Sequence, residues 1–522
     1  MAWKRLASVM ALSWLMCVPA ACGENDAGGA PAGQEAPMVS AGDTTYYVDG
    51  ERGDDGSDGT APERAWRTLA RVNSVRFAPG DRILLRAGTR YAGQLRLQGS
   101  GSEGRPIVLD MYGEGEKPRI DGEGRHQETV LLANAEHWEV SNLEITNRGE
   151  ERKPHLAGVR VKLEDFGTAH HIHLRNLYVH DVYGNNVKEQ GGSGIQWTNE
   201  GRTVKSRFDG LLIEGCHLVR TDRNGITGWS GHWQRTQWYP SLNVVIRGNL
   251  LEDIGGDGIV PIGCDGALIE HNVLRGGRTR APDYAAGIWP WSCDNTVVQF
   301  NEVSGMKGTK DGQGFDSDWN CRNTLIQYNY SHDNEGGFLL ICNNGWSKAP
   351  ENVGNVGTVV RYNISQNDGA RTFMISAVED TTIYNNTVYV GEGMDVPLVQ
   401  HHDWGGYAKD TRFYNNIFYA DGTMRYEFAE SEGNVFEGNA FFGHHENRPE
   451  DARAIAADPL LVGPGSGGDG LDSVAGYEVR AGSPCIGVGI AVPGNGGRDF
   501  WGNTVPEAGR PDIGAHQRGG AR

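Results

Sequence analysis

The chain has 522 residues, with 48 Lys plus Arg against 67 Asp plus Glu and a formal net charge of −19 at pH 7. This acidic balance, without any basic stripe, would repel a phosphate backbone, so we expect no nucleic-acid partner. Gly occurs at 76 positions and hydrophobic residues make up 38% of the chain, which indicates turns within a folded chain and excludes extensive disorder.

The first 22 residues have the features of an export signal. Two basic residues precede an apolar run over residues 6–18 and a stretch of small residues that ends at Cys22. The letters VPAAC resemble the box at which bacterial lipoproteins are cleaved and lipidated, which implies a membrane tether through Cys22. Pro19 departs from that box, and simple secretion is the alternative. We predict a signal peptide over 1–22, a flexible linker over 23–44, and a protein secreted or lipid-anchored at the bacterial cell envelope.

The next segment, residues 45–130, is predicted to form an N-terminal cap and the first coils of a solenoid. The strand-like letters TYYVDG precede an amphipathic stretch, residues 62–72, which we expect to be a short helix that covers the open edge of the first coil. The segments PGDRILLRAG and PIVLDMYGEG then begin the coils.

Residues 131–445 carry a repeat in which an apolar residue and two variable residues precede Asn. It is clearest at Asn249, Asn272, Asn301, Asn329, Asn363, Asn386, Asn416 and Asn439, with Asn142, Asn176 and Cys216 as earlier variants. The unequal spacing suits a β-helix whose loops lengthen independently, and it predicts about eleven coils. We expect each Asn to occupy a left-handed turn and to stack its amide on the next coil.

A second register starts with Gly and reads as a second strand in every coil, at Gly158, Gly194, Gly225, Gly258, Gly287, Gly314 and Gly337. Strands that stack in parallel from coil to coil need a right-handed crossover. The predicted fold is therefore all-β, a right-handed parallel β-helix. Residues 446–522, with the Gly-rich letters SPCIGVGI and PDIGAHQ, are expected to form a C-terminal loop and closing coils.

The YYVDG opening, the PGD segment, the Asn-ended repeats and the PDIGA close resemble the pectin-lyase-like superfamily of parallel β-helix proteins. The resemblance covers residues 45–516. It implies a carbohydrate-active β-helix, and it does not choose among lyases, hydrolases, epimerases and phage tailspikes.

Alternation along the Gly-register strands sorts their residues by face. The residue after each Gly is apolar and should point inward, whereas the outward positions include three tryptophans and two carboxylates, Trp229, Trp289, Trp291, Asp316 and Asp318. Exposed indoles suit the apolar faces of sugar rings, so the tryptophans are candidate substrate-binding residues. The alternative is a one-residue slip that would bury both Trp and Asp.

The two carboxylates should lie about 6.6 Å apart, within the range that inverting glycosidases use. Asp316 and Asp318 would then act as acid and base. Asp311 is a further candidate partner, and a closer approach of its carboxylate would suit a retaining mechanism instead. A polysaccharide lyase is the second hypothesis. In it, Asp311, Asp316 and Asp318 would hold Ca²⁺, and Lys310 or Lys307 would remove the proton.

Two further positions could extend the substrate-binding surface formed by the outward tryptophans and carboxylates. Arg371 and His401 are candidate substrate-binding residues, although each can also be explained as part of a loop cluster. His401 and His402 make no convincing metal site, because neighbours on an extended segment point apart.

Four cysteines lie at similar distances after the Gly positions, which places them at equivalent turns of consecutive coils. We predict the disulfides Cys264–Cys293 and Cys321–Cys342, with a ladder of buried free thiols as the alternative.

The sequence thus predicts a monomeric, extracytoplasmic enzyme that cleaves a polysaccharide, with hydrolysis slightly favoured over a Ca²⁺-dependent elimination. A noncatalytic glycan-binding or adhesion protein is the alternative from another class.

Overall fold

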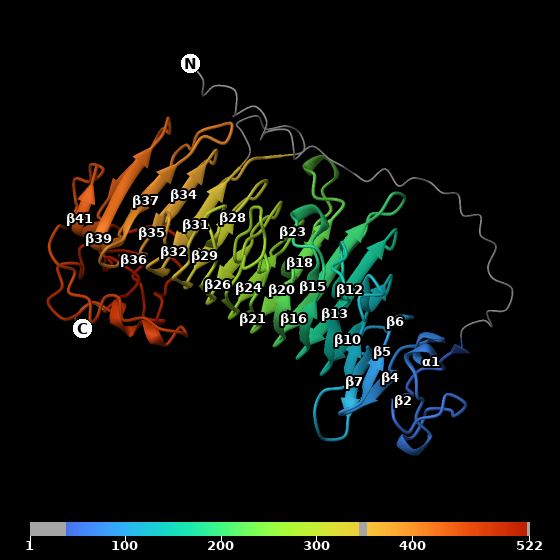
Figure 1. The fold of residues 1–522 in the computed structure, drawn as a ribbon. Helices are drawn as coiled ribbons and strands as arrows, with labels where there is room; N and C mark the ends of the chain where they lie inside the picture. The colour runs from blue at the N-terminus through green and yellow to red at the C-terminus, as the bar shows by residue number, and fades with distance from the viewer. Residues whose placement is uncertain (1–37, 344–351, 519–522) are drawn as a thin grey trace. The chain divides into compact units, whose positions relative to one another are not determined.

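The computed structural model describes residues 38–343 and 352–518. The chain divides into two compact units, residues 1–38 and 39–522. The predicted signal peptide, Cys22 and most of the predicted linker lie outside the described residues. In the larger unit, strands stack in chain order from β2 to β41 (Figure 1). Within the described ranges, no helix is both long and apolar enough to cross a membrane.

The larger unit is the predicted right-handed parallel β-helix, and its strands form three faces. The first face stacks β2 (Thr45–Val48), β4 (Arg82–Arg86), β7 (Ile107–Tyr112), β10 (Trp138–Ser141), β13 (Thr168–Arg175), β16 (Arg207–Glu214), β20 (Val245–Arg247), β24 (Leu268–Glu270), β26 (Val297–Gln299), β29 (Leu325–Gln327), β32 (Val359–Arg361), β35 (Thr382–Tyr384), β38 (Arg412–Tyr414) and β40 (Val435–Glu437), beside the short β19 (Ser241–Leu242) and β23 (Cys264–Asp265).

The second face stacks β5 (Arg90–Ala92), β8 (Arg119–Asp121), β11 (Glu144–Asn147), β14 (Tyr178–Val182), β17 (His217–Thr221), β21 (Leu250–Glu252), β25 (Val273–Arg275), β27 (Glu302–Ser304), β30 (Tyr330–His332), β33 (Ile364–Gln366), β36 (Thr387–Val390), β39 (Ile417–Phe428) and β41 (Ala440–Glu446). The third face stacks β6 (Leu95–Leu97), β9 (Glu128–Ala133), β12 (Ala157–Glu164), β15 (Ser193–Glu200), β18 (Asn224–Ser230) and β22 (Ile259–Val260), then β28 (Gln313–Ser317), β31 (Gly337–Cys342), β34 (Phe373–Ser376) and β37 (Asp395–His401).

The remaining elements are short. They are β1 (Met38–Val39), β3 (Val75–Arg76), α1 (Leu69–Asn73) and four 3₁₀ turns, η1 (Pro62–Arg64), η2 (Lys188–Gln190), η3 (Arg235–Gln237) and η4 (Ser473–Tyr477). The helix α1 buries Leu69 and Val72 at the first coils and is capped by the Thr68 side chain, which accepts from the backbone of Arg71. This is the short helix predicted within the N-terminal cap.

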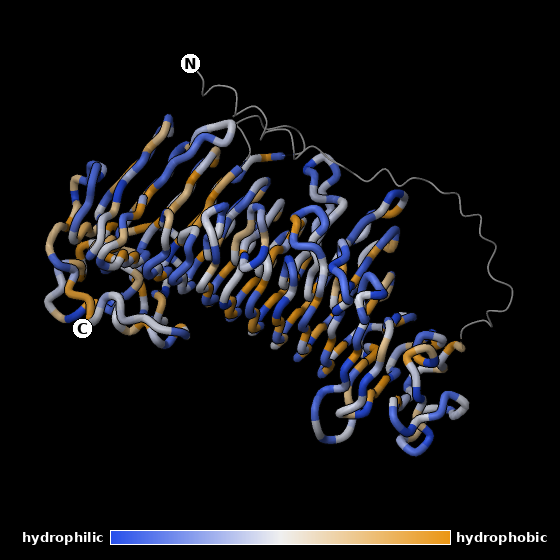
Figure 2. Tube along the Cα trace, in the orientation of Figure 1, coloured by the Kyte–Doolittle hydropathy of each residue, from blue (hydrophilic) through white to orange (hydrophobic). Residues whose placement is uncertain are grey.

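Hydrophobic and hydrophilic residues alternate along the strands (Figure 2), and the inward ones form one continuous core. Val159, Ile195 and Phe315 are at most 1% exposed, as their Gly register predicts. The register slips by one residue at β31, because Gly337 pairs with Gln313 and Leu339 with Phe315. Leu339 and Ile341, predicted to point outward, therefore lie in the core, and their neighbours Leu340 and Cys342 lie outside it.

The Asn ladder is real, but its backbone differs from the prediction. From Asn272 to Asn439 each repeat Asn accepts from the preceding one, so that Asn301 Nδ2 lies 3.0 Å from Asn329 Oδ1. Along this part of the ladder the left-handed residue is the one before the Asn, as at Phe300 with φ 53° and Tyr328 with φ 56°. The earlier variants Asn142 and Asn176 are left-handed themselves, as predicted. The eleven repeat positions follow the strands of the first face from β10 to β40, and β2, β4 and β7 precede them.

The C-terminal segment does not form the expected closing coils. Among the described residues, no strand follows β41. The segment instead folds back along earlier coils, where the carbonyl of Arg498 accepts from the Tyr328 hydroxyl at 3.0 Å and that of Gly494 accepts from Arg361 at 2.6 Å. Its Gly and Pro residues suit such an irregular path.

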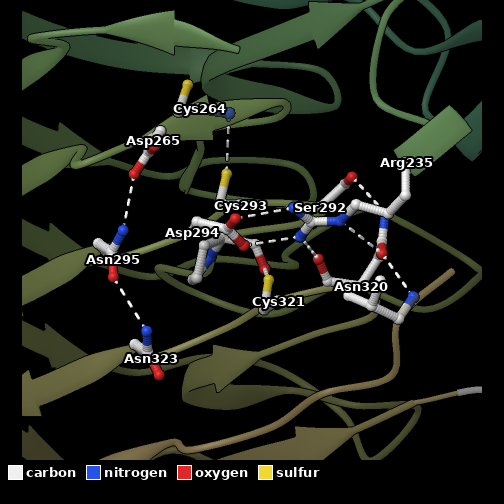
Figure 3. Close-up of polar contacts among 12 residues, drawn as sticks. Arg235, Cys264, Asp265, Ser292, Cys293, Asp294, Asn295, Asn320, Cys321 and Asn323 are labelled. Carbon is white, nitrogen blue, oxygen red and sulfur yellow. Dashed lines mark hydrogen bonds and ion pairs between the residues drawn. The ribbon is translucent and has the colours of Figure 1, made fainter. Parts of the chain in front are cut away.

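The predicted disulfides are wrong, because all four cysteines are free and buried. Cys264, Cys293 and Cys321 follow one another on consecutive coils (Figure 3). Their thiols contact backbone carbonyl oxygens, as at Cys293, whose Sγ lies 3.3 Å from the Trp291 oxygen. Cys342 is outside the core because of the slip at β31, which removes it from the column.

Candidate active site

The candidate site lies on the outer side of the third face, between β22 and β31. The coil between β22 and β28 has no regular strand there, only isolated bridges, among them those from Ile288 to Ile259 and Phe315 and that from Trp291 to Ile262. Pro261 and Pro290 lack the N–H that a ladder needs, which explains this interruption. Ile288 is bridged to Phe315, and Asp316 pairs with Leu340. Asp316 therefore lies between Trp289 on the preceding coil and Leu340 on the following coil.

Trp289 and Trp291 point outward as predicted, but they are not exposed. They are 5% and 8% exposed and pack with Val260 and Ala286 in a cluster separate from the core, against which Trp233, Ile262 and Trp319 also pack. The expectation that both indoles form an open sugar platform is therefore wrong. Trp229, 41% exposed, is the one of the three predicted tryptophans that solvent reaches freely.

An insertion between β18 and β19 covers these indoles. Its Trp233 ring lies 4.7 Å from the Trp291 ring, centroid to centroid. Arg235 fixes the insertion to the coils, since its guanidinium binds Asp294 at 2.8 and 2.7 Å and Asn320 Oδ1 at 3.0 Å (Figure 3). The bidentate geometry makes this a strong anchor.

Asp311, Asp316 and Asp318 form a group that we call the carboxylate cluster. Asp316 is 2% exposed and its Oδ1 has no hydrogen-bond partner among the described residues, whereas Asp311 and Asp318 are half-buried. One carboxylate oxygen of Asp316 lies within 4.8 Å of one of Asp318. These nearest oxygens thus lie closer together than the roughly 6.5–9.5 Å that separates the carboxyl groups of inverting glycosidases.

Cys342 and Trp319 provide hydrogen bonds to Asp318. The Cys342 thiol lies 3.1 Å from Asp318 Oδ1, and the Trp319 backbone N–H donates to the same oxygen at 2.6 Å. Leu340, Cys342 and Met374 form an apolar cluster beside the carboxylates, with Trp319 and Trp404 packed against it.

Burial within these apolar walls raises the pKa of all three carboxyls. It raises the pKa of Asp318 to about 6, and that of Asp311 above its usual range. The pKa of Asp316 is raised well above its ordinary value, through burial and then through the neighbouring Asp318 charge. A carboxyl pair with separated pKa values can hold one proton near neutral pH, which is the state that general acid catalysis needs.

Lys188, which the sequence did not single out, is a cation that acts on all three carboxyls. Its charge lowers the pKa of all three carboxyls, against the effect of burial. Its Nζ lies 5.3 Å from the centre of the Trp289 ring. Lys188 belongs to η2, in the Gly-rich connection between β14 and β15, and a single sequence gives no sign that this loop folds over a coil four turns away.

A buried ion pair supports this side of the site. Arg223 is 0% exposed and lies 3.3 Å from Asp257, whose Oδ1 accepts from the Trp289 indole N–H at 3.1 Å. Asp257 thus fixes the ring on which Lys188 lies. Neither Arg223 nor Asp257 was predicted, because both are ordinary strand-end residues in the sequence.

The other predicted site residues are dispersed. Lys310 is exposed and donates to the Pro282 carbonyl at 3.1 Å, and Lys307 pairs with Glu335 at 3.1 Å. Arg371 donates to the backbone oxygens of Thr309 and Asp311, so it supports the Asp311 loop.

His401 does not reach the outer side of the third face. It pairs in register with Ile375, so it points into the core, where it is 4% exposed and its ring contacts Phe428. Its role as a substrate-binding residue is therefore wrong, and burial lowers its pKa to about 4.

The donor set does not suit the Ca²⁺ expected for a lyase. Asp316, Asp318 and Cys342 bring ligand atoms within 4.8 Å of one another. A thiol is a poor ligand for a hard cation that requires six to eight oxygens. Asp311, the third predicted ligand, is not part of that group.

Fold and site together define a carbohydrate-active parallel β-helix of the pectin-lyase-like superfamily. Residues 209–356 match the family model described as right handed beta helix region. The crystal structure of a GH136 lacto-N-biosidase from Eubacterium ramulus aligns with a TM-score of 0.60 and 30% identity, over 75% of this chain and 68% of that one. The chain belongs to family GH136.

One further sequence relative and one further structure are similar to the chain. It is 30% identical to a lacto-N-biosidase of Bifidobacterium longum over 609 aligned residues, which cover 93% of this chain and 37% of that protein. The chain thus spans about a third of that relative's length. A complex of XylC with xylose aligns with a TM-score of 0.51 at 14% identity, which shows the fold alone.

Proposed function

We propose that this protein is a glycoside hydrolase that acts outside the cytoplasm and releases a lacto-N-biose unit, or a closely related disaccharide, from a larger glycan. The observation that carries the hydrolase assignment is the carboxylate cluster, three Asp side chains whose pKa values burial raises beside apolar walls. The substrate class rests on membership of GH136 and on the names of the two relatives.

Asp311 and Asp318 are the proposed catalytic residues, because they are half-buried and can be reached by a sugar. Asp318 accepts hydrogen bonds from Cys342 and Trp319, which favour its ionised form. It therefore acts as the nucleophile or base. Asp311 carries the proton to the leaving oxygen, since burial raises its pKa.

Asp316 is a positioning residue in this proposal. At 2% exposure it cannot touch a sugar ring, yet its charge state sets the potential at Asp318. Trp229, 41% exposed on β18, is proposed to stack on a sugar unit farther along the groove.

Incubation of the purified chain with a p-nitrophenyl glycoside of lacto-N-biose, and with milk and mucin glycans, tests the activity. Hydrolysis releases p-nitrophenol and the intact disaccharide. A chelator should leave this activity unchanged. An elimination would instead leave an unsaturated sugar with ultraviolet absorbance and would require Ca²⁺. Binding of glycans without any product over long incubation would favour the noncatalytic alternative and overturn the proposal.

A further inference from the structure

A second group of chemically competent side chains lies on the outer side of the first face. Glu139 on β10 and His171 and His173 on β13 bring their ligand atoms within 4.8 Å of one another. His171 Nε2 lies 2.9 Å from Glu139 Oε1, and His173 Nδ1 lies 3.8 Å from the same oxygen. Ligands of a tetrahedral Zn²⁺ with bonds of about 2.0–2.1 Å lie about 3.3 Å apart. The observed separations bracket that value.

The corner of the β-helix places both imidazoles on one side of a strand. His173 faces outward, because it lies between the core residues Ile172 and Leu174. Ala169 and Ile172 are core residues at 1% exposure, so His170 and His171 between them both face outward as well. This arrangement requires a left-handed residue, and His171 has φ 53°. The equivalent corner residues of the neighbouring coils, His137 and Gly210, are left-handed as well. His171 and His173 consequently lie with ring centroids 3.8 Å apart.

His173 is prepared to be a ligand. Its Nδ1 is buried and has no hydrogen-bond partner among the described residues. Burial, followed by the charges of His171 and Arg175, lowers the pKa of His173 to about 4. The ring is thus neutral at pH 7, and neutral imidazole is the form that binds metals.

Among the described residues, Arg175 is an arginine that competes for Glu139. Its Nη1 lies 3.8 Å from Glu139 Oε2, but its Nε is held by Glu214 at 3.2 Å. The Arg175 contact is thus with Glu139 Oε2, whereas both imidazoles lie against Oε1. The other titratable groups around the cluster are Glu136, His137, His170 and Asp209.

We propose that Glu139, His171 and His173 bind one divalent transition-metal ion of the zinc class, with solvent in the fourth position. Two imidazoles and one carboxylate form a donor set that such ions prefer. The ligands come from two adjacent coils, so the ion would join them. Because the unfolded chain lacks this arrangement, binding would stabilise the folded protein.

Calorimetric titration of chelator-treated protein without a polyhistidine tag, using ZnCl₂ at pH 7.5, tests the proposal. We expect one Zn²⁺ per chain, a rise in Tm on binding, and at least tenfold weaker binding by H171A, H173A and E139Q. H170A is the matched control, since His170 is a neighbour that is not in the group, and it should bind as the unmodified protein does.

Co²⁺ supplies a second readout that needs no variant, because tetrahedral coordination gives intense visible bands and octahedral coordination in solvent does not. The unmodified protein should show the intense bands. Absence of Zn²⁺ binding by the unmodified protein, or unchanged affinity in the H171A/H173A double variant, would overturn the proposal. Glycosidase activity does not enter either measurement.

Discussion

The thiol of Cys342 lies 3.1 Å from Oδ1 of Asp318, so a cysteine provides a hydrogen bond to a proposed catalytic carboxylate. This bond lowers the pKa of Asp318, whereas burial raises it to about 6. Asp318 acts in its ionised form, so activity is lost as the pH falls through about 6. The groups that face it are Asp311, Asp316, Lys188 and Cys342.

Replacement of Cys342 by Ala should therefore move the acidic limb of kcat/KM to higher pH. Ser at this position retains a donor and should restore most of the profile. The measurement is the pH dependence of kcat/KM for the three proteins. An unshifted acidic limb in C342A would show that the thiol is only a packing group.

Lys188→Met should act in the same direction, because it removes the cation that lowers the pKa of all three carboxyls. We expect kcat/KM near pH 6 to fall by about tenfold, with partial recovery at higher pH. Lys188→Arg keeps the charge and should lose less. Lys310→Met is the matched control, since Lys310 is exposed and bound to the Pro282 carbonyl. Equal losses in K188M and K310M would contradict the assignment.

Asp316→Asn should stabilise the fold at neutral pH. The folded-state pKa of Asp316 is raised well above the ordinary 3.8. The contribution of Asp316 to the stability of the wild-type protein is therefore fully present below the pKa of Asp316 in the unfolded chain, about 4. This contribution is lost as the pH rises toward the folded-state pKa. Asn mimics the protonated form, so its Tm should exceed that of wild type by about 2–4 °C at pH 8. The difference should vanish near pH 4, and a lower Tm at pH 8 would disprove the account.

The Asn ladder should be the most sensitive part of the fold. Asn329 is 0% exposed and accepts from both the backbone N–H and the side-chain amide of Asn301. Asn329→Ala leaves the Asn301 backbone N–H unpaired and removes the bonds that the Asn329 amide donates to the Val298 carbonyl and to Asn363, so it should cost about 2–5 kcal/mol. Asn323→Gly is the control, because Asn323 is exposed at a left-handed corner that Gly adopts freely. Urea unfolding of both variants measures the difference, and comparable losses would refute the ladder's role.

The β-helix was predictable because repetition reports on backbone geometry. A recurring Asn predicts a buried side-chain amide at the same place in each coil, and a recurring Gly predicts the start of the next strand. Both predictions hold for loops of any length or sequence. Cys342 escaped the prediction because its strand is shifted by one residue at Gly337, where φ is 126°. That slip moved two predicted outward residues into the core and brought a thiol to Asp318.

The environment of the site was less accessible to sequence reasoning, because loops from distant coils create it. Trp289 and Trp291 face outward as alternation requires, but the insertion carrying Trp233 covers them. Lys188 reaches the carboxylates from a loop that precedes them by more than a hundred residues. Such contacts form only when the chain folds, and the local sequence pattern does not predict them.

The decisive measurement for the catalytic role of the carboxylate cluster is turnover of a p-nitrophenyl glycoside of lacto-N-biose by wild type and by D311N, D316N and D318N. We expect hydrolysis by wild type and losses of about 10³-fold or more in D311N and D318N, which retain the wild-type fold. D316N should lose less and show a shifted pH profile. Wild-type turnover in D318N, with p-nitrophenol released at an unchanged rate, would contradict the assignment of the carboxylate cluster as the catalytic centre.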